Sequence, residues 1–581
     1  MKTKYILSNT EITLKNEGQI VLIKGWIARK RNIGAKIFLI LRDFSGIIQL
    51  VIDKEHTQYH QIASLKTESV VEIKGLVRER INKNLNLQTG EIEILIKKCL
   101  ILSEAQDLPL NIFEKTKASE EHRLKYRYLD LRKEEKKKYL VKRHQITQNI
   151  RQTLLNNNFL ELETPILSKS TPEGARDYLV PSRIYPLSFY ALPQSPQIFK
   201  QLYMLSGFER YFQIARCFRD EDLRSDRQPE FTQIDIEASF CTKENIMTLI
   251  EEIIKNLFDC IFKQNLKTPL TKITYDEALN LYGTDKPDLR FDLLIENLTS
   301  YFEVDFLNKD NIKKHIKGIK LDINNHKDFF SRKKLDYYKK LIKEKFTLDL
   351  NFIQKQNNTF KGYLSNFITN SSFIKEKEIY FFILFNKVKE INQNNVLKAL
   401  GFLRNKLAQD LELYEPHKES LLWIVDFPLL KLDESQMKYV SIHHPFTAPI
   451  NIEQLYKEPD KVKAQTYDLI WNGYEIGGGS LRNYQYQVQE FIFEKLGLTK
   501  EEIQQNFGFF NEALKYGAPP HGGIALGLDR LVMLFTKTNN IKDVIAFPKT
   551  QSGQDLMMKS PDFIDEKQLT ILKLQKLEKN K

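Results

Sequence analysis

Residues 211–240 read YFQIARCFRDEDLRSDRQPEFTQIDIEASF, in which two runs of alternating character flank a charged loop. The alternation predicts strands over 211–219 and 231–240, because successive side chains of a strand point to opposite faces. Gln233, Asp235 and Glu237 then share one face of the second strand. Burying several charged side chains is costly unless they meet a ligand or one another. A sheet with one hydrated face is the alternative interpretation.

A glycine-rich stretch, GGIALGLDRL at 522–531, predicts a strand that enters a helix. Arg530 falls in the first helical turn, where free backbone N–H groups and the helix dipole favour an anion. A guanidinium at this place can bind phosphate in a forked geometry. A packing turn with a solvent-exposed arginine is the alternative.

Three consecutive glycines, 477–479, lie within a predicted strand over 472–481. Asp468 and Glu475 precede them, and Arg482 follows. Two carboxylates near phosphate-binding arginines suit Mg²⁺, which takes one or two carboxylates together with phosphate oxygens. Two unrelated surface acids are the alternative. The sequence has neither a Walker loop nor a GxGxxG motif after a strand, so P-loop and Rossmann nucleotide binding are not indicated.

The first hundred residues predict a small barrel. Short strands are expected over 19–28, 37–42, 47–52, 70–77 and 91–97, and this size matches an OB-fold. Phe38 and Gln49 would lie beside a basic turn at 29–31. An aromatic ring, an amide and cations together suit a splayed single-stranded base. A core phenylalanine beside solvated charges is the alternative.

The length of 581 residues predicts several domains. We expect an OB-fold domain over 1–107, a charged linker over 108–132 and a main domain over 133–287 and 416–581. A lysine- and asparagine-rich insert over 288–415 interrupts the main domain. Apolar spacing predicts one long helix over 133–158, and residues 174–240 are expected to be rich in strands.

The composition, with 42% hydrophobic and 28% charged residues, is ordinary for a soluble globular chain. No run of 18 apolar residues and no secretory leader is found. The net charge of +13 favours a nucleic-acid partner, although a lysine-rich composition bias explains it equally well. The four cysteines are at least 19 residues apart, which excludes CxxC pairs and fits a reducing cytoplasm.

Three motifs in order resemble the class II aminoacyl-tRNA synthetases: FLELETP at 159–165 (motif 1), FRDE at 218–221 (motif 2) and GLDRL at 527–531 (motif 3). STPEGARDY at 170–178, QSPQIFKQ at 194–201, HHPFT at 443–447 and the stretch 473–482 narrow the resemblance to bacterial-type aspartyl-tRNA synthetases. It covers 1–287 and 416–555. The insert departs from the family, because ILF at 383–385 stands where a Gly-Ala-Asp signature is expected, while ALGFLR at 399–404 matches.

The resemblance implies a multidomain α+β architecture: an OB-fold barrel that binds the anticodon, an antiparallel catalytic sheet with helices, and an inserted α/β domain of GAD type. It implies ATP-dependent activation of aspartate with Mg²⁺, transfer to tRNA-Asp, and a homodimer formed through motif 1. Arg219, Glu221 and Arg530 would be the catalytic residues. Whether tRNA-Asn is also aspartylated stays open.

The resemblance also implies residue roles. Lys200 and Arg482 would clamp the side-chain carboxylate of aspartate. The other aspartate-binding residues would be Glu173, Ser195, Gln197, Arg219, Asp235, His443 and His444. The ATP-binding residues would be Arg219, Asp220, Glu221, Gln228, Phe231, Glu475, Gly527, Leu528, Asp529 and Arg530. Asp468 and Glu475 would hold Mg²⁺. Arg29, Phe38, Gln49 and Glu93 would contact the anticodon.

Two rival functions remain. One is an asparaginyl- or lysyl-specific relative, against which Lys200 and Arg482 argue. The other is an RNA-binding protein whose synthetase body has lost catalysis, and the intact Arg219, Glu221 and Arg530 argue against that loss.

Overall fold

The structure is a computed structural model that describes residues 4–5, 8–112, 118–170, 174–303, 307, 314–323, 330–369, 373–386, 390–415, 417–433 and 438–575. The chain divides into two compact units, Met1–Asp130 and Leu131–Lys581. In the described part, no helix is long and apolar enough to cross a membrane. None of the four cysteines forms a disulfide.

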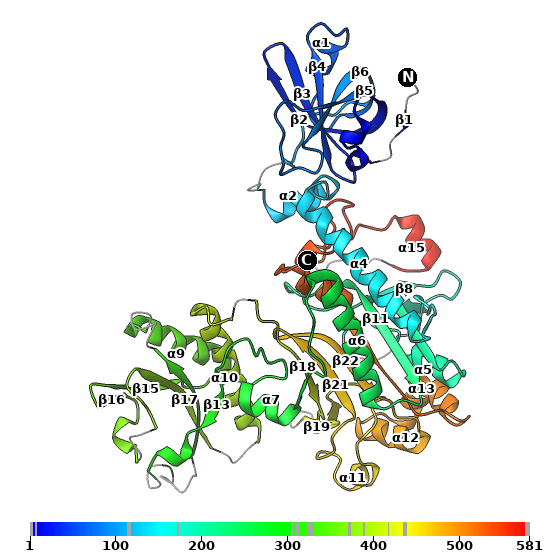
Figure 1. Cartoon of the computed structure of the whole chain (residues 1–581). Helices are drawn as coiled ribbons and strands as arrows, with labels where there is room; N and C mark the ends of the chain where they lie inside the picture. The colour runs from blue at the N-terminus through cyan, green and yellow to red at the C-terminus, as the bar shows by residue number, and fades with distance from the viewer. Residues whose placement is uncertain are drawn as a thin grey trace. The chain divides into compact units, whose positions relative to one another are not determined.

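The first unit contains a closed barrel, drawn in blue in Figure 1. Its sheet has the order β1-β2-β3-β4-β6-β5, and a β2–β5 pairing closes it. The strands are β1 (Lys4–Tyr5), β2 (Ile20–Ile33), β3 (Lys36–Arg42), β4 (Ile47–Asp53), β5 (Val70–Glu79) and β6 (Ile92–Ser103), with helices α1 (Tyr59–Ser64), α2 (Glu120–Lys125) and α3 (Arg127–Asp130). The predicted basic turn at 29–31 is wrong: these residues extend β2, because its pairing with β3 continues to Ile33.

The second unit is built on an eight-stranded sheet of order β12-β18-β21-β22-β23-β11-β10-β7. Its strands are β7 (Leu160–Glu161), β10 (Arg210–Phe218), β11 (Glu230–Ser239), β12 (Thr271–Thr274), β18 (Leu421–Val425), β21 (Thr466–Trp471), β22 (Tyr474–Leu481) and β23 (His521–Gly527). The pairings from β10 through β18 are antiparallel, as predicted, and β7 and β12 pair in parallel at the edges.

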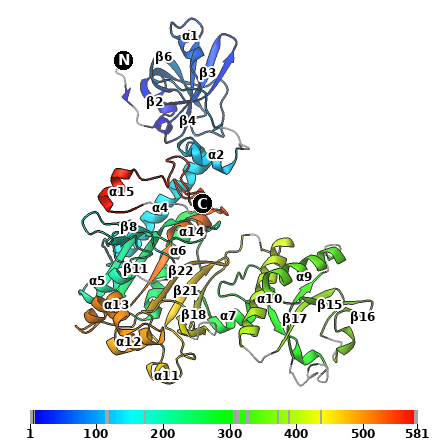
Figure 2. The ribbon, with the colours of Figure 1, turned by 180° about the vertical axis from the view of Figure 1, so that it is seen from behind.

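One face of this sheet forms the main core. Helices α4 (Glu134–Asn156), α6 (Lys243–Phe262) and α14 (Leu528–Phe535) cover it, and Ile234 and Ile236 of β11 are buried beneath them. Figures 1 and 2 show α4 and α6 lying across the strands. The opposite face carries Asp235 and Glu237, both with no exposed surface, so these two acids are buried and do not lie on an open solvent face.

The remaining elements surround the sheet. They are α5 (Gln197–Leu205), α7 (Tyr275–Tyr282), α11 (Ile452–Lys457), α12 (Tyr486–Lys495), α13 (Lys500–Leu514), α15 (Glu566–Leu572) and the hairpins β8 (Leu179–Pro181)–β9 (Phe189–Ala191) and β19 (Leu430–Asp433)–β20 (Lys438–Ser441). Helix α5 interrupts the stretch that we expected to be rich in strands.

The insert has a sheet and cores of its own. The sheet order is β13-β14-β17-β15-β16. Its elements are β13 (Ile295–Asn297), β14 (Lys314–Asp322), β15 (Asn351–Gln356), β16 (Thr359–Gly362), β17 (Glu378–Asn386), α9 (Arg332–Phe346) and α10 (Glu390–Asp410). Residues 383–385, where a Gly-Ala-Asp signature was expected, lie in the central strand β17.

Candidate active site

A cavity of about 820 Å³ opens on the polar face of the large sheet. It gathers side chains from segments far apart in the sequence. The predicted residues that line it are Ser195, Gln197, Lys200, Arg219, Asp220, Glu221, Gln228, Phe231, Asp235, His443, His444, Asp468, Glu475, Arg482, Gly527, Asp529 and Arg530. Motifs 2 and 3 therefore meet at one place, although the sequence separates them by more than 300 residues.

Two acids and two bases form a buried cluster at the floor of the cavity. Lys200 Nζ, from the second turn of α5, lies 3.1 Å from Asp235 Oδ1 and 3.4 Å from Glu237 Oε2. Arg482 donates from Nε and Nη2 to Glu237 over 2.9 and 3.1 Å. The two predicted clamp cations therefore converge, but they do so on a protein carboxylate, Glu237, that the sequence analysis gave no role.

The close approach of β23 explains how Glu237 fits. Gly523 pairs with Glu237 across the sheet. A Cβ at Gly523 would lie 2.1 Å from Glu237 Oε2, which is too close for any side chain. Burial acts to raise the pKa of Glu237, but Arg482 and Lys200 outweigh it and lower that pKa. Glu237 is therefore ionised and holds both cations in place.

Several buried polar atoms lining the cavity have no hydrogen-bond partner among the residues that the structure describes. They are Gln197 Nε2, Arg219 Nε and Asp235 Oδ2. Burial raises the pKa of Asp235, while Lys200 opposes that rise. Unsatisfied buried donors and acceptors are costly, so these atoms are where a polar ligand gains most.

Around the residues predicted to bind ATP, cations lie near acids and an aromatic ring. The Arg219 guanidinium lies 5.1 Å from the ring centroid of Phe231. Arg530, in the first turn of α14, donates to Asp226 Oδ2 over 3.1 Å and to the Glu475 carbonyl oxygen over 2.8 Å. Glu221 pairs with Arg227 over 2.7 Å. Asp226 and Arg227 were missed by the sequence analysis, although both lie in the quoted loop.

Asp468 and Glu475 both line the cavity and offer carboxylate oxygens for a cation. His443 Nε2 lies 3.0 Å from Asp468 Oδ1, and Lys286 Nζ lies 2.6 Å from Glu475 Oε2. Burial raises the pKa of Asp468. No cluster of three or more metal-binding side chains occurs in the part of the chain that the structure describes. Such a two-carboxylate donor set fits Mg²⁺ bound together with phosphate oxygens, and does not form a complete protein cage.

Lys286 is a further cavity residue that the sequence analysis missed. It lies in the loop that leads from α7 into the insert. The buried Arg404 of α10 donates to the carbonyl oxygens of Asp288, Phe291 and Leu293 in the same segment. The motif at 399–404 thus anchors the loop that carries Lys286, and this is a contribution of the insert to the cavity.

Two predicted ATP-binding residues of α14, Leu528 and Asp529, make structural contacts. Leu528 is buried in the main core and does not line the cavity. The carboxylate of Asp529 accepts from Arg143 of α4 and from the Thr232 N–H, so it holds α14 to its neighbours. Glu173 lies outside the described residues.

In the barrel, the predicted anticodon residues lie side by side. The register runs from Arg29 through Ile40, Gln49 and Glu93 to Arg78. Gln49 Nε2 and Arg78 Nε each donate to the Glu93 carboxylate over 2.7 Å. Phe38 is two residues from Ile40 in β3 and so points to the same face. Arg78 was missed by the sequence analysis.

Two family models match the chain. "tRNA synthetases class II (D, K and N)" matches residues 119–551, and "OB-fold nucleic acid binding domain" matches residues 21–102. Among curated relatives, the aspartate–tRNA ligase of Aster yellows witches'-broom phytoplasma (strain AYWB) is 57% identical, with 99% of each chain covered. The aspartate–tRNA(Asp/Asn) ligase of Geobacillus sp. (strain WCH70) is 46% identical, with 97% of each chain covered.

Solved structures share the fold at low identity. The asparaginyl-tRNA synthetase of Pyrococcus horikoshii complexed with asparaginyl-adenylate has a TM-score of 0.59 at 19% identity, covering 94% of this chain and 98% of that one. The putative aspartyl-tRNA synthetase of Leishmania major Friedlin has a TM-score of 0.59 at 17% identity, with 94% of each chain covered. These likenesses support the fold.

Proposed function

The chain belongs to the class II tRNA synthetases of the D, K and N group, and from this premise we propose that it is an aspartate–tRNA ligase. It activates L-aspartate with ATP, releases pyrophosphate and transfers aspartate to the terminal adenosine of tRNA-Asp. The buried cluster of Lys200, Asp235, Glu237 and Arg482 is the observation that carries the choice of amino acid.

Charge balance supports aspartate. With all four groups ionised the cluster is neutral, and Arg219, which lines the same cavity, gives this set of five residues one positive charge. Aspartate has a net charge of −1 and balances it, whereas asparagine leaves the positive charge uncompensated. In this arrangement, Lys200 and Arg482 receive the side-chain carboxylate, and Asp235 Oδ2 accepts from the ammonium group. An unpaired buried charge costs several kcal/mol, which is about a 10³-fold or greater discrimination.

The protein positions the reactants and stabilises charge. Arg219 orients the aspartate α-carboxylate for in-line attack on the α-phosphorus, Phe231 stacks on adenine, and Arg530 holds the outer phosphates. Arg530 exchanges Asp226 for phosphate oxygens when ATP enters. Asp468 and Glu475 would hold Mg²⁺, which supplies charge neutralisation on the phosphates. Little acid–base chemistry is needed, so positioning and electrostatics supply the rate.

Amino-acid-dependent ATP–pyrophosphate exchange tests the proposal. We expect exchange with aspartate and none above background with asparagine, lysine or glutamate. Exchange with asparagine or lysine instead would show an asparaginyl- or lysyl-specific enzyme. Absence of exchange with every amino acid would show an RNA-binding protein that has lost catalysis. Charging of purified tRNA-Asp and tRNA-Asn separates a discriminating enzyme from a non-discriminating one. The two relatives are an aspartate–tRNA ligase and an aspartate–tRNA(Asp/Asn) ligase.

A homodimer is part of the proposal. The strand β7 lies at the edge of the large sheet, and Leu160, Ile166 and Leu167 beside it are about half exposed. An apolar sheet edge of this kind requires cover, and a second copy of the chain supplies it. Light scattering at micromolar concentration should give twice the mass of 68.5 kDa. A monomer would contradict this. We place the enzyme in the cytoplasm, where tRNA is aminoacylated for translation.

A further inference from the structure

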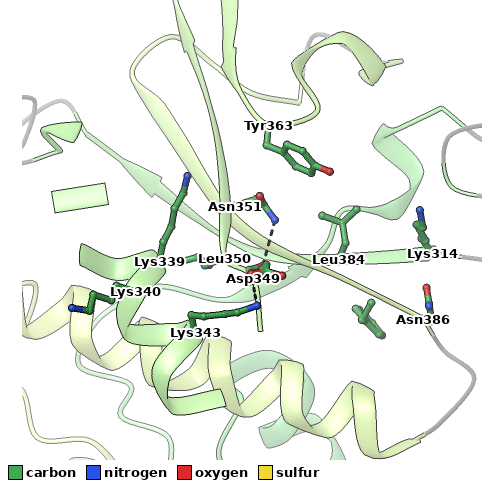
Figure 3. A pocket seen from close by; sticks show the side chains of 11 residues that line it. Lys314, Lys339, Lys340, Lys343, Asp349, Leu350, Asn351, Tyr363, Leu384 and Asn386 are labelled. Carbon is green, nitrogen blue, oxygen red and sulfur yellow. Dashed lines mark hydrogen bonds and ion pairs between the residues drawn. The ribbon is translucent and has the colours of Figure 1, made fainter. Parts of the chain in front are cut away.

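A second large cavity, of about 900 Å³, lies in the insert, away from the active site. It opens between α9 and the ends of three sheet strands (Figure 3). Its lining residues are Lys314, Lys339, Lys340, Lys343, Asp349, Leu350, Asn351, Tyr363, Leu384, Phe385 and Asn386. Four lysines against one aspartate make this groove basic.

The basic character exceeds the bias of the whole chain. Helix α9 has the sequence RKKLDYYKKLIKEKF, with seven basic and two acidic residues, while the chain as a whole has 88 basic and 75 acidic residues. Like charges close together on a helix repel one another and destabilise it. A lysine-rich composition alone therefore does not explain why these lysines lie along one groove.

The ion pairs in the groove do not consume its charge. Lys343 pairs with Asp349 over 2.8 Å and Lys340 pairs with Glu344 over 3.6 Å, but all four side chains are more than half exposed. Exposed pairs of this kind contribute about 0–1 kcal/mol and exchange readily for another anion. Lys339 lies 5.0 Å from the Phe352 ring, which orients its stem without neutralising it.

The other groups in the groove specify the kind of anion. Tyr363 is 56% exposed, and Asn351 and Asn386 offer amides. An exposed aromatic ring beside lysines suits RNA, because a base can stack while phosphates meet ammonium groups. The lining has no arginine, so the forked recognition of a single phosphate is absent and a chain of phosphates is favoured.

We propose that this groove binds the ribose-phosphate backbone of tRNA near its acceptor end. The proposal rests on the proposed function. The insert and the active-site cavity belong to one compact unit, and the barrel belongs to the other. If the barrel takes the anticodon, the arm of tRNA offered to the second unit is the acceptor arm. Lysine contacts to phosphates carry no base information, so this binding adds affinity and not identity.

The test compares two double variants of the full chain. K339Q/K343Q removes two groove charges one helical turn apart. R332Q/K333Q removes two basic residues of the same helix that do not line the groove. Binding of an RNA minihelix with the acceptor and T stems is measured over a series of salt concentrations, because the minihelix lacks the anticodon.

We expect the slope of log K against log salt to become less steep by about 1.8 in K339Q/K343Q, because each phosphate contact on a duplex contributes about 0.9, and to stay unchanged in R332Q/K333Q. A fourfold rise in salt then weakens K339Q/K343Q about 12-fold less than the unaltered protein. Equal slopes in the two variants would overturn the proposal. If the slopes are equal but K339Q/K343Q binds inorganic phosphate more weakly than R332Q/K333Q, the groove binds a small anion and not RNA, and the proposal is also overturned.

Thermal unfolding of both variants checks that the insert is intact. Aspartate-dependent ATP–pyrophosphate exchange should be the same in both variants as in the unaltered chain. Absence of that exchange in the unaltered chain would refute the proposed function. Intact exchange together with equal salt slopes would refute only the proposal that the groove binds tRNA.

Discussion

At the residue scale, the charge of the cavity depends on a few side chains with buried partners. Lys200 is 1% exposed and Arg482 is 3% exposed, so bulk water does not solvate the carboxylate that would be left unpaired if either cation were substituted. Both cations pair with Glu237, whose single negative charge neutralises only one of them. A single substitution in this cluster is therefore expected to lower the stability of the sheet and, under the proposed function, to weaken the recognition of aspartate.

Lys200→Met should raise the aspartate KM or lower kcat/KM by about 10³-fold or more, because one of the two cations facing the substrate carboxylate is lost. The ATP KM should change little, since Lys200 contacts neither the phosphate arginines nor Phe231. Steady-state ATP–pyrophosphate exchange measures both constants. Arg216→Met is the matched control, because Arg216 belongs to an exposed pair with Glu230. An unchanged aspartate KM in Lys200→Met defeats the assignment.

Glu237→Gln should destabilise the second unit by about 3–5 kcal/mol at pH 7, because two buried cations lose their shared partner. The pKa of Glu237 is lowered below its ordinary value of 4.5 in the folded protein. Its stabilisation is therefore complete above pH 4.5 and is lost as the pH falls through the lowered pKa. Urea unfolding at several pH values, followed by the fluorescence of the core residues Trp423 and Trp471, measures the difference. A difference that grows on acidification contradicts this account.

At the element scale, β23 must lie close to both of its neighbours. Gly523 faces Glu237 of β11 and Ser480 of β22. Because Gly523 has no Cβ, the Glu237 carboxylate fits against the strand without a steric clash. Gly523 is thus required for the close packing of β23 on β11. Gly527 has no such close neighbour and lies beside the residues predicted to bind ATP.

Gly523→Ala should lower the free energy of unfolding by about 3 kcal/mol or more, since the new methyl group lies 2.1 Å from both Glu237 Oε2 and the Ile236 carbonyl oxygen. Gly527→Ala is the control in the same strand, because its Cβ would have no neighbour nearer than 3.8 Å. It should cost less than about 1 kcal/mol. Denaturant unfolding of both variants measures the contrast, and equal stability would contradict the packing argument.

At the scale of the whole molecule, the chain separates RNA recognition from amino-acid chemistry. The barrel has its own core of residues from Ile12 to Cys99, and the catalytic sheet has another. Two units with independent cores can lose one function without unfolding the other.

Gln49→Ala should weaken aminoacylation of tRNA through a higher tRNA KM, about 10-fold or more, because the Gln49–Glu93 pair presents the amide on the barrel face. ATP–pyrophosphate exchange should stay intact. Gln61→Ala, at an exposed position of α1, is the control. Parallel loss of both activities in Gln49→Ala would contradict the separation of the two units.

The sequence by itself determined the strands β10, β11, β22 and β23, the polar face of β11 and the motifs that mark the family. These are local or periodic properties, and the alternation of Gln233, Asp235 and Glu237 expresses one of them directly. Only the tertiary structure decided the pairing of Lys200 and Arg482 on Glu237, the place of Lys286 opposite Glu475, and the core position of Leu528. Each of these joins segments tens to hundreds of residues apart, and the energy of a buried charge depends on neighbours in space, which spacing along the chain does not specify.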